Sequence, residues 1–206
     1  MTKLILVRHC ETSWNDECRF QGHIDVLLNA RGRREAECLA ERFAAERVDA
    51  IYTSDLRRAR DTAQVIAQSL NKSILIESRL REACLGELQG KTYAEVHDRW
   101  YSTIQIMPCY FVDRAPPGVE SLRELQARLM DAIEPIAAQH QNGTVLIVTH
   151  GACLRAMFCA WLGIELSSYW KLRFDSGSVS IVQLTESGTT IALLNDTSHL
   201  HTKGKE

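Results

Sequence analysis

Leu4-Ile5-Leu6-Val7 runs directly into Arg8-His9 near the start of the chain. Val145-Leu146-Ile147-Val148 runs in the same way into Thr149-His150. A short apolar run that turns polar at its C-terminal end is typical of a strand buried on both faces of a parallel sheet. Ligands in open α/β sheets bind beyond the carboxyl ends of the strands, so we expect both histidines at one site with Arg8 beside them. Histidine with arginine predicts an anionic ligand, most commonly phosphate.

Strand-like and helix-like segments alternate through the rest of the chain. Further strands are expected at 50–53 and 74–76, with two or three more near 169–195, and helices at 29–46, 56–70, 92–101, 120–140 and 152–162. Asn29 is the expected N-cap of the first helix, because its side chain can accept a hydrogen bond from the first turn. No repeat, low-complexity segment or long linker divides the sequence. We therefore predict one α/β domain over residues 1–206.

Composition and charge exclude several classes of protein. The net charge is −2, from 24 basic and 26 acidic residues, which is no signature of a nucleic-acid partner. The N-terminus enters a strand without the features of a signal peptide, and no apolar stretch approaches the roughly 18 residues of a membrane span. Seven cysteines form no C-x-x-C pair, which favours free thiols in a reducing compartment. We expect a cytoplasmic protein with no membrane partner.

Four polar clusters follow the apolar segments in order. They are Arg8-His9-Cys10-Glu11-Thr12-Ser13-Trp14-Asn15 with Gln21-Gly22, Ser54-Asp55-Leu56-Arg57-Arg58-Ala59-Arg60-Asp61-Thr62-Ala63, Leu80-Arg81-Glu82 with the glycines that follow, and Thr149-His150-Gly151. Together they closely resemble the histidine phosphatase superfamily, in the branch with cofactor-dependent phosphoglycerate mutases and bacterial broad-specificity and α-ribazole phosphatases. The resemblance is collinear from residue 4 to about 200. It implies a three-layer α/β sandwich, whose mostly parallel central sheet has helices on both faces.

The resemblance also implies a role for each matched residue. The implied catalytic residues are His9, Glu82, Arg8, Arg58 and His150, and the implied substrate-binding residues are Asn15, Gln21, Gly22 and Gly151. His9 is the nucleophile and Glu82 the proton donor. The implied reaction is hydrolysis of a small phosphorylated metabolite through a phosphohistidine, with no metal and no cofactor.

The residue types suit that chemistry. Two nearby arginines disfavour the imidazolium by like-charge repulsion and hold His9 neutral, the form that attacks phosphorus. Bidentate guanidinium groups also match phosphate and stabilise charge on its equatorial oxygens. Glu82 must carry a proton to release the alkoxide as an alcohol, and it then serves as base for the water that hydrolyses phospho-His9.

Some assignments keep alternatives. Arg57 is a reserve candidate for Arg58, and is otherwise read as part of a solvated helix face together with Arg31, Arg33, Arg34 and Arg60. Glu11 and Glu87 compete with Glu82 for the acid role. His199 is expected to be structural, although its neighbourhood matches the family.

Cys10 departs from the family, which has glycine at this position. Glycine permits close backbone approach or positive φ beside phosphate, whereas cysteine carries a Cβ. Either the backbone at Cys10 is ordinary, or the loop is shifted. An accessible Cys10 beside arginines would also have a lowered pKa, and we expect it to be sensitive to peroxide.

The stretch 102–118 bears on the choice between phosphatase and mutase. It is short and mostly apolar, with Arg114 its only cation. A mutase must hold a second anionic group, so this stretch favours a phosphatase acting on alcohols or aryl esters. The alternatives are phosphoglycerate mutase-type transfer, an α-ribazole phosphatase of cobalamin synthesis, and a non-catalytic phospholigand-binding protein. A homodimer is retained as a partner expectation.

Overall fold

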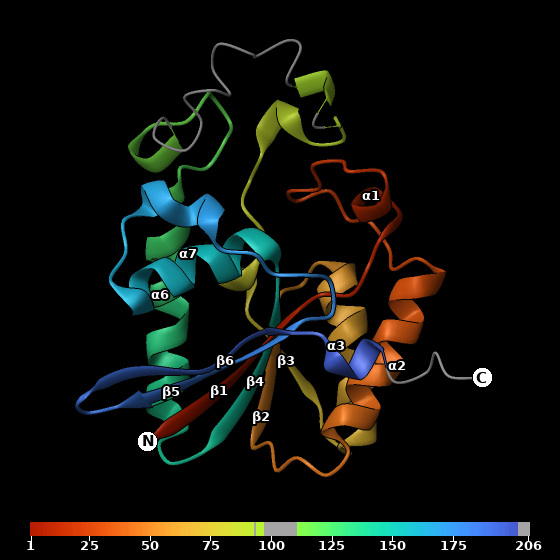
Figure 1. Ribbon diagram of the computed structural model, residues 1–206, viewed down its shortest axis with the longest axis vertical. Helices are drawn as coiled ribbons and strands as arrows, with labels where there is room; N and C mark the ends of the chain where they lie inside the picture. Colours follow the sequence, from red (N-terminus) through yellow and green to blue (C-terminus); the bar gives the residue numbers. More distant parts are fainter. Residues whose placement is uncertain (93, 97–110, 202–206) are drawn as a thin grey trace.

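The computed structural model describes residues 1–92, 94–96 and 111–201. Their strands are β1 (Thr2–Arg8), β2 (Ala50–Thr53), β3 (Ile74–Ile76), β4 (Thr144–Thr149), β5 (Val179–Thr185) and β6 (Gly188–Asp196). The α-helices are α1 (Ser13–Asp16), α2 (Ala30–Phe43), α3 (Arg57–Ser69), α6 (Leu122–Gln139) and α7 (Gly151–Leu162). Short 3-10 helices lie at η1 (Ser78–Leu80), η2 (Gly86–Leu88), η3 (Leu166–Lys171) and η4 (Ser198–Leu200). All six strands form one sheet, ordered β3-β2-β4-β1-β5-β6 (Figure 1).

The two strands with terminal histidines are neighbours at the centre of this sheet. β1 and β4 pair in parallel, with Leu4 opposite Val145 and Arg8 opposite Thr149. Alternate residues of β1 pack into different cores, Leu4 on one face and Ile5 on the other. Burial on both faces explains why these strands are apolar without alternation. The predicted adjacency is confirmed.

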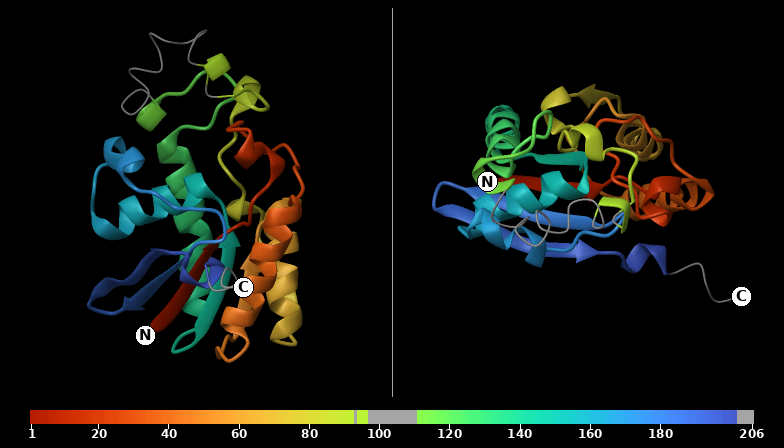
Figure 2. Two further views of the ribbon diagram at one scale, coloured as in Figure 1. Left: turned by 45° about the vertical axis from the view of Figure 1, so that its right-hand side comes forward. Right: turned by 90° about the horizontal axis from the view of Figure 1, so that it is seen from above.

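Helices cover both faces, as expected. α2 and α3 pack together on one face, where Leu39 and Ile66 belong to the same core as Ile5. α6 and α7 pack on the other face, where Leu129 and Phe158 join the core of Leu4 (Figures 1 and 2). β2, β3 and β4 run parallel to β1, whereas β5 and β6 are antiparallel to their neighbours. The three-layer sandwich with a mostly parallel sheet is confirmed.

Local signals explain where the long helices begin. The Asn29 side chain accepts a hydrogen bond from the Gly32 amide at 2.7 Å, which confirms the predicted cap. α2 ends at Phe43 rather than Glu46, and the Glu46 amide bonds back to the Phe43 carbonyl in a turn. Ser121 begins α6 through a reciprocal capping box with Glu124.

Three further predictions have different outcomes. The expected strands near 169–195 are present as β5 and β6, and residues 169–171 before them are part of η3. The predicted helix at 92–101 falls largely on residues outside the described ranges. Of its described residues, 94–96 are helical. The single-domain assignment stays a prediction. Among the described helices, none combines the length and apolar character needed to cross a bilayer.

The loops that follow the parallel strands β1, β2, β3 and β4 gather at one end of the sheet. β1 runs from the N-terminus toward this end, and its last residue is followed by the segment that carries α1 (Figure 2). The Arg8 amide bonds to Ser178 O at 3.1 Å and the His9 amide to Thr149 O at 2.9 Å. These bonds fix the end of β1 against both neighbouring strands, which positions the site described next.

Candidate active site

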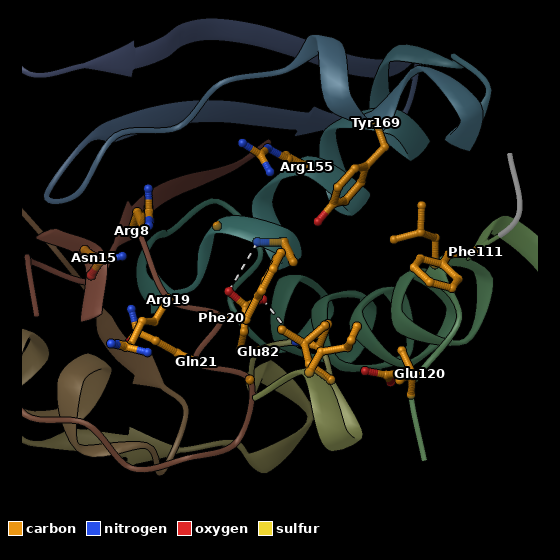
Figure 3. A pocket seen from close by; sticks show the side chains of 18 of the residues that line it. Arg8, Asn15, Arg19, Phe20, Gln21, Glu82, Phe111, Glu120, Arg155 and Tyr169 are labelled. Atoms are coloured by element: carbon orange, nitrogen blue, oxygen red, sulfur yellow. Dashed lines mark hydrogen bonds between the residues drawn. The ribbon is translucent and has the colours of Figure 1, made fainter. Parts of the chain in front are cut away.

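A cavity of about 200 Å³ lies at this end of the sheet (Figure 3). Eight of the nine predicted site residues line it: Arg8, His9, Asn15, Gln21, Gly22, Arg58, Glu82 and Gly151. The ninth, His150, is fully buried beside it. The sequence motifs therefore converge on one place, although they are spread over more than half of the chain.

The surroundings of His9 favour a neutral imidazole whose Nε2 lone pair is available. Its Nδ1 lies 2.8 Å from the Cys10 carbonyl oxygen, which can only accept, so Nδ1 carries the hydrogen. This leaves the lone pair on Nε2. Burial, followed by the charges of Arg58 and Arg8, holds the pKa of His9 well below its ordinary value. The predicted effect of the arginines is present, but desolvation is the larger cause.

His150 lies next to His9, with the ring centroids 5.2 Å apart. Its Nε2 is 2.8 Å from Ser54 Oγ, at the end of β2. Burial and the charge of Arg58 lower the pKa of His150 well below its ordinary value. If the Ser54 hydroxyl donates to Nε2, Nδ1 carries the hydrogen and can donate to an anion. Within the described part of the chain, Nδ1 is buried and has no hydrogen-bond partner.

Both predicted arginines are anchored by backbone carbonyls. Arg8 Nη1 donates to Phe174 O at 2.7 Å. Arg58 donates to Gly22 O at 2.7 Å and to Ile24 O at 2.9 Å, which ties the rim loop to α3. The Nε atoms of both arginines are buried and have no partner among the described residues. Unpartnered buried donors are costly, and an anion bound here would satisfy them.

Gly151 allows α7 to begin close to Arg8. A Cβ at this position would lie 3.3 Å from Arg8 Nε, tighter than an ordinary contact. Gly22 is required for two reasons, since its φ is +53° and a Cβ would lie 2.3 Å from Gln89 Oε1. Neither position has room for a side chain without local rearrangement.

Glu82 is a half-buried carboxylate of the cavity. Its Oε1 accepts from the Ala83 amide at 3.0 Å, and its Oε2 lies 3.4 Å from the Ala152 amide in the first turn of α7. Its backbone carbonyl is held by His23 Nε2 at 2.7 Å. The side chain is thus fixed against the helix that also carries Gly151.

The competing carboxylates lie elsewhere. Glu11 lines a neighbouring cavity and contacts Arg31 at 3.3 Å and Asn29 at 2.9 Å. Glu87 is exposed and is not among the cavity residues. Glu120 does line the cavity, but Arg128 binds both of its oxygens at 2.7 and 2.8 Å. Geometry therefore favours Glu82 for the acid role.

Asn15 and Gln21 occupy the cavity wall. Asn15 Oδ1 accepts from the Thr12 amide at 3.1 Å and the Thr12 hydroxyl at 2.9 Å, in the capping box of α1. These bonds leave the Asn15 amide NH₂ group as the part that can donate to a ligand. Gln21 Oε1 is buried and has no partner in the described ranges.

The expectation that Cys10 is accessible and acidic is wrong. Its side chain is 0% exposed and packs in the core beneath α2 and α3. Burial raises the pKa of the Cys10 thiol, because the thiolate would be desolvated. Its φ is not in the positive region, and its amide donates to Thr62 Oγ1 at 3.1 Å. An ordinary backbone therefore accommodates cysteine here, with the side chain turned away from the cavity.

The arginines expected on solvated surfaces and the histidine expected to be structural lie where they were predicted. The solvated arginines Arg31, Arg33, Arg34, Arg57 and Arg60 are all exposed. His199 is buried away from the cavity, with Nε2 3.1 Å from Gly177 O and Nδ1 2.8 Å from Arg42 Nη1.

Sequence reasoning missed the other half of the cavity. Its aromatic and cationic lining consists of Arg19, Phe20, Phe111, Arg155, Tyr169 and Trp170. Arg155 had a usable signal, because it lies four residues after Gly151 on the same face of α7. The aromatic residues come from separate segments without periodicity, and nothing in the chain marks them. The described residues contain no metal-binding group of three or more His, Cys, Asp or Glu side chains, and metal independence stays a prediction.

Comparison with known proteins agrees with this geometry. The family model described as "Histidine phosphatase superfamily (branch 1)" matches residues 4–197. "Phosphoserine phosphatase 1" from Hydrogenobacter thermophilus is 36% identical over 202 residues, covering 97% of this chain and 95% of that protein. "Probable phosphoglycerate mutase GpmB" from Escherichia coli is 35% identical over 208 residues, covering 97% and 95%. The structure of "Bacillus stearothermophilus YhfR" has a TM-score of 0.90 and 34% identity, covering 97% of this chain and 100% of that chain.

Proposed function

The chain belongs to the histidine phosphatase superfamily and is a phosphomonoester hydrolase, and we propose that it acts through a phosphohistidine on His9. The surroundings of His9 carry the proposal. His9 is buried and neutral, its Nδ1 is bound to the Cys10 carbonyl, and it shares the cavity with Arg8 and Glu82. A neutral imidazole with a free Nε2 is a competent nucleophile for phosphorus.

The first step forms the phosphoenzyme. Nε2 of His9 attacks phosphorus as the bond to the alcohol oxygen breaks. Protonated Glu82 gives its proton to that oxygen, so that a neutral alcohol leaves. Arg8 and Arg58 stabilise the charge on the equatorial oxygens, with the Gly151 amide and Asn15 as further donors. His150 adds a donor from Nδ1 when Ser54 donates to its Nε2.

The second step regenerates the enzyme. Glu82, now a carboxylate, removes a proton from water, whose oxygen attacks the phosphorus of phospho-His9. The N–P bond breaks, inorganic phosphate leaves, and both His9 and Glu82 return to their starting states. No metal or cofactor takes part, because the arginines and histidines supply the positive charge and the donors.

Mutase-type transfer is the second candidate. The leaving-group half of the cavity contains Arg19 and Arg155, and a mutase needs cations there to hold a second anionic group. The two reactions share phospho-His9 and differ in its fate. Incubation with 3-phosphoglycerate separates them, since a phosphatase releases inorganic phosphate and glycerate, whereas a mutase forms 2-phosphoglycerate.

The deciding experiment traps the intermediate. The enzyme is mixed with p-nitrophenyl phosphate, quenched in alkali and digested, and the phosphorylated peptide is located by mass spectrometry. We expect acid-labile phosphate on the peptide that contains His9, and none in His9→Ala. His201→Ala is the matched control, because this histidine is exposed. Phosphate release without a phosphorylated His9 would contradict the mechanism.

A further inference from the structure

Arg155 lies in the leaving-group half of the cavity and, among the described residues, forms no ion pair with a carboxylate. Arg8 and Arg58 lie at the nucleophile, where the transferred phosphoryl group binds. Arg19 is paired with Glu17 at 2.6 Å and Glu95 at 3.5 Å. No carboxylate among the described residues forms an ion pair with Arg155, whose Nε donates to Leu172 O at 2.9 Å.

The Arg155 side chain is nevertheless held in place. Its guanidinium carbon lies 5.5 Å from the ring centroids of both Tyr169 and Trp170. Such contacts orient the guanidinium plane. Because Nε is bound to Leu172 O, the η nitrogens, which lie beside the Tyr169 hydroxyl, are the atoms that can face a ligand. A preorganised arginine loses less conformational entropy on binding than a free one. This side chain is therefore built for a planar anion.

The position of Arg155 places that anion on the leaving group. Arg155 lies one turn along α7 from Gly151, which adjoins Arg8, and from Ala152, whose amide faces Glu82. In Figure 3 it lies between Arg8 and Tyr169, across from Glu82. The alcohol part of a substrate bound at His9 would extend past Glu82 into this half of the cavity.

The charges of this half support the same conclusion. Two carboxylates line it: Glu82 is assigned to proton transfer, and Glu120 is bound on both oxygens by Arg128. Apart from Arg19, which is paired with Glu17 and Glu95, the rest of the lining is mostly apolar and includes Leu88 and Phe111. A partly buried, unbalanced guanidinium among apolar groups is stabilised when a substrate brings the negative charge.

We propose that Arg155 binds a carboxylate on the alcohol part of the substrate, so that the substrates are phosphate esters of small hydroxy acids. This inference rests on the proposed function and names its substrate class. A planar carboxylate matches the bidentate guanidinium fork. A second phosphoryl group would bring a larger charge than the one guanidinium of Arg155 balances, and it is the less favoured ligand.

The test uses two substrates that differ only in the carboxylate. O-phospho-L-serine and O-phosphoethanolamine share the phosphate, the ammonium group and the carbon chain between them. In the wild-type enzyme, kcat/KM should favour phosphoserine by about tenfold to a hundredfold, the range expected for a charged hydrogen bond. Arg155→Gln should remove most of this preference and change kcat/KM for phosphoethanolamine less than about threefold, and Arg155→Lys should retain part of it.

The controls separate the possible failures. Arg173→Gln is the matched variant, because Arg173 is 80% exposed in its side chain and lies outside this cavity. Equal losses on both substrates in Arg155→Gln would overturn the proposal, and so would a wild-type enzyme without preference between them. Failure of the proposed function looks different: no phosphate is released from p-nitrophenyl phosphate, and His9 is not phosphorylated.

Discussion

The two halves of the cavity are built in different ways. The phosphoryl half contains Arg8 together with His9, Arg58 and His150, the last three at most 2% exposed. These residues lie at the ends of adjacent parallel strands or in the first turn of a following helix. The leaving-group half is formed by separate segments, and its Trp170 is 45% exposed. The buried half is set by the sheet, whereas the open half can change with its loops. Reaction type and substrate choice are therefore carried by different parts of the fold.

Removal of the nucleophile should have the largest effect and should be independent of the leaving group. We expect His9→Ala to lower kcat by at least about four orders of magnitude on every phosphomonoester, as is typical for loss of a covalent nucleophile. Phosphate release from p-nitrophenyl phosphate and from phosphoserine measures it, with His201→Ala as control. A residual rate that depends strongly on the substrate would show that the halves are not separate.

Glu82 stands where the two halves meet, and its removal should be sensitive to the leaving group. Glu82→Gln cannot donate a proton, so we expect a loss of about 10² to 10⁴ in kcat/KM on alkyl phosphates. The loss should be smaller on p-nitrophenyl phosphate, whose phenolate leaves without protonation. Glu87→Gln is the matched control, because Glu87 is exposed. Equal losses on both substrates would argue against Glu82 as the acid.

Ser54 tests the buried half without touching the nucleophile. Ser54→Ala removes the hydroxyl that contacts His150 Nε2 and frees the imidazole to change tautomer. We expect about a tenfold loss in kcat/KM, the usual effect of one buried hydrogen bond, equally on alkyl and aryl esters. Ser69→Ala on the exposed face of α3 should leave the rate unchanged. An unchanged rate in Ser54→Ala would remove His150 Nδ1 from the list of donors.

Burial of the phosphoryl half also predicts its pH dependence. A histidine with the ordinary pKa of 6.5 would be about 90% protonated at pH 5.5. Since the pKa of His9 lies well below that value, His9 stays neutral. After correction for titration of the ester itself, kcat/KM should fall between pH 7 and 5.5 by much less than the roughly eightfold loss expected from a histidine with the ordinary pKa. A tenfold fall attributable to the enzyme would contradict this.

The lowered pKa values of His9 and His150 also make the stability of the folded protein depend on pH. A histidine whose pKa is lowered in the folded state binds more protons when unfolded. Its contribution is complete above pH 6.5 and is lost as the pH falls toward the folded value. The melting temperature should therefore decrease below pH 6.5, and less so in His150→Gln, where one titrating group is gone.

Substitutions in the open half of the cavity should have the smallest effects on the kinetic constants. Trp170→Ala removes one of the two rings that orient Arg155. We expect about a twofold to fivefold change in KM for substrates that reach this ring, in keeping with an exposed cation–π contact, and no change in phosphorylation of His9. Leu162→Ala, another exposed apolar position outside the cavity, is the control. A large decrease in kcat would mean that the open half also shapes the buried one.

The buried half could be predicted from the sequence because its signals are local. Arg8, His9 and His150 directly follow buried apolar runs, and Arg58 lies in the first turn of α3 within a motif that resembles the family's, so the sequence predicts all four. The prediction was wrong for Cys10, where it depended on the direction in which a side chain points. Cys10 was expected to face the arginines, but its side chain points into the core beneath α2 and α3. Whether a loop side chain faces the site or the core depends on the packing of distant helices.

What the sequence by itself determined is the sheet and the order of the motifs, and the resemblance carried by those motifs implied the residues of phosphoryl transfer. The sheet and the motif order follow from apolar runs and their polar ends, which are properties of neighbours along the chain. Only the tertiary structure decided that burial is the main cause of the lowered pKa of His9, that Ser54 holds His150, and that Arg155 lies against Tyr169 without a carboxylate partner among the described residues. Desolvation and ion pairing depend on what surrounds a group in space, and those neighbours come from segments that the sequence keeps far apart.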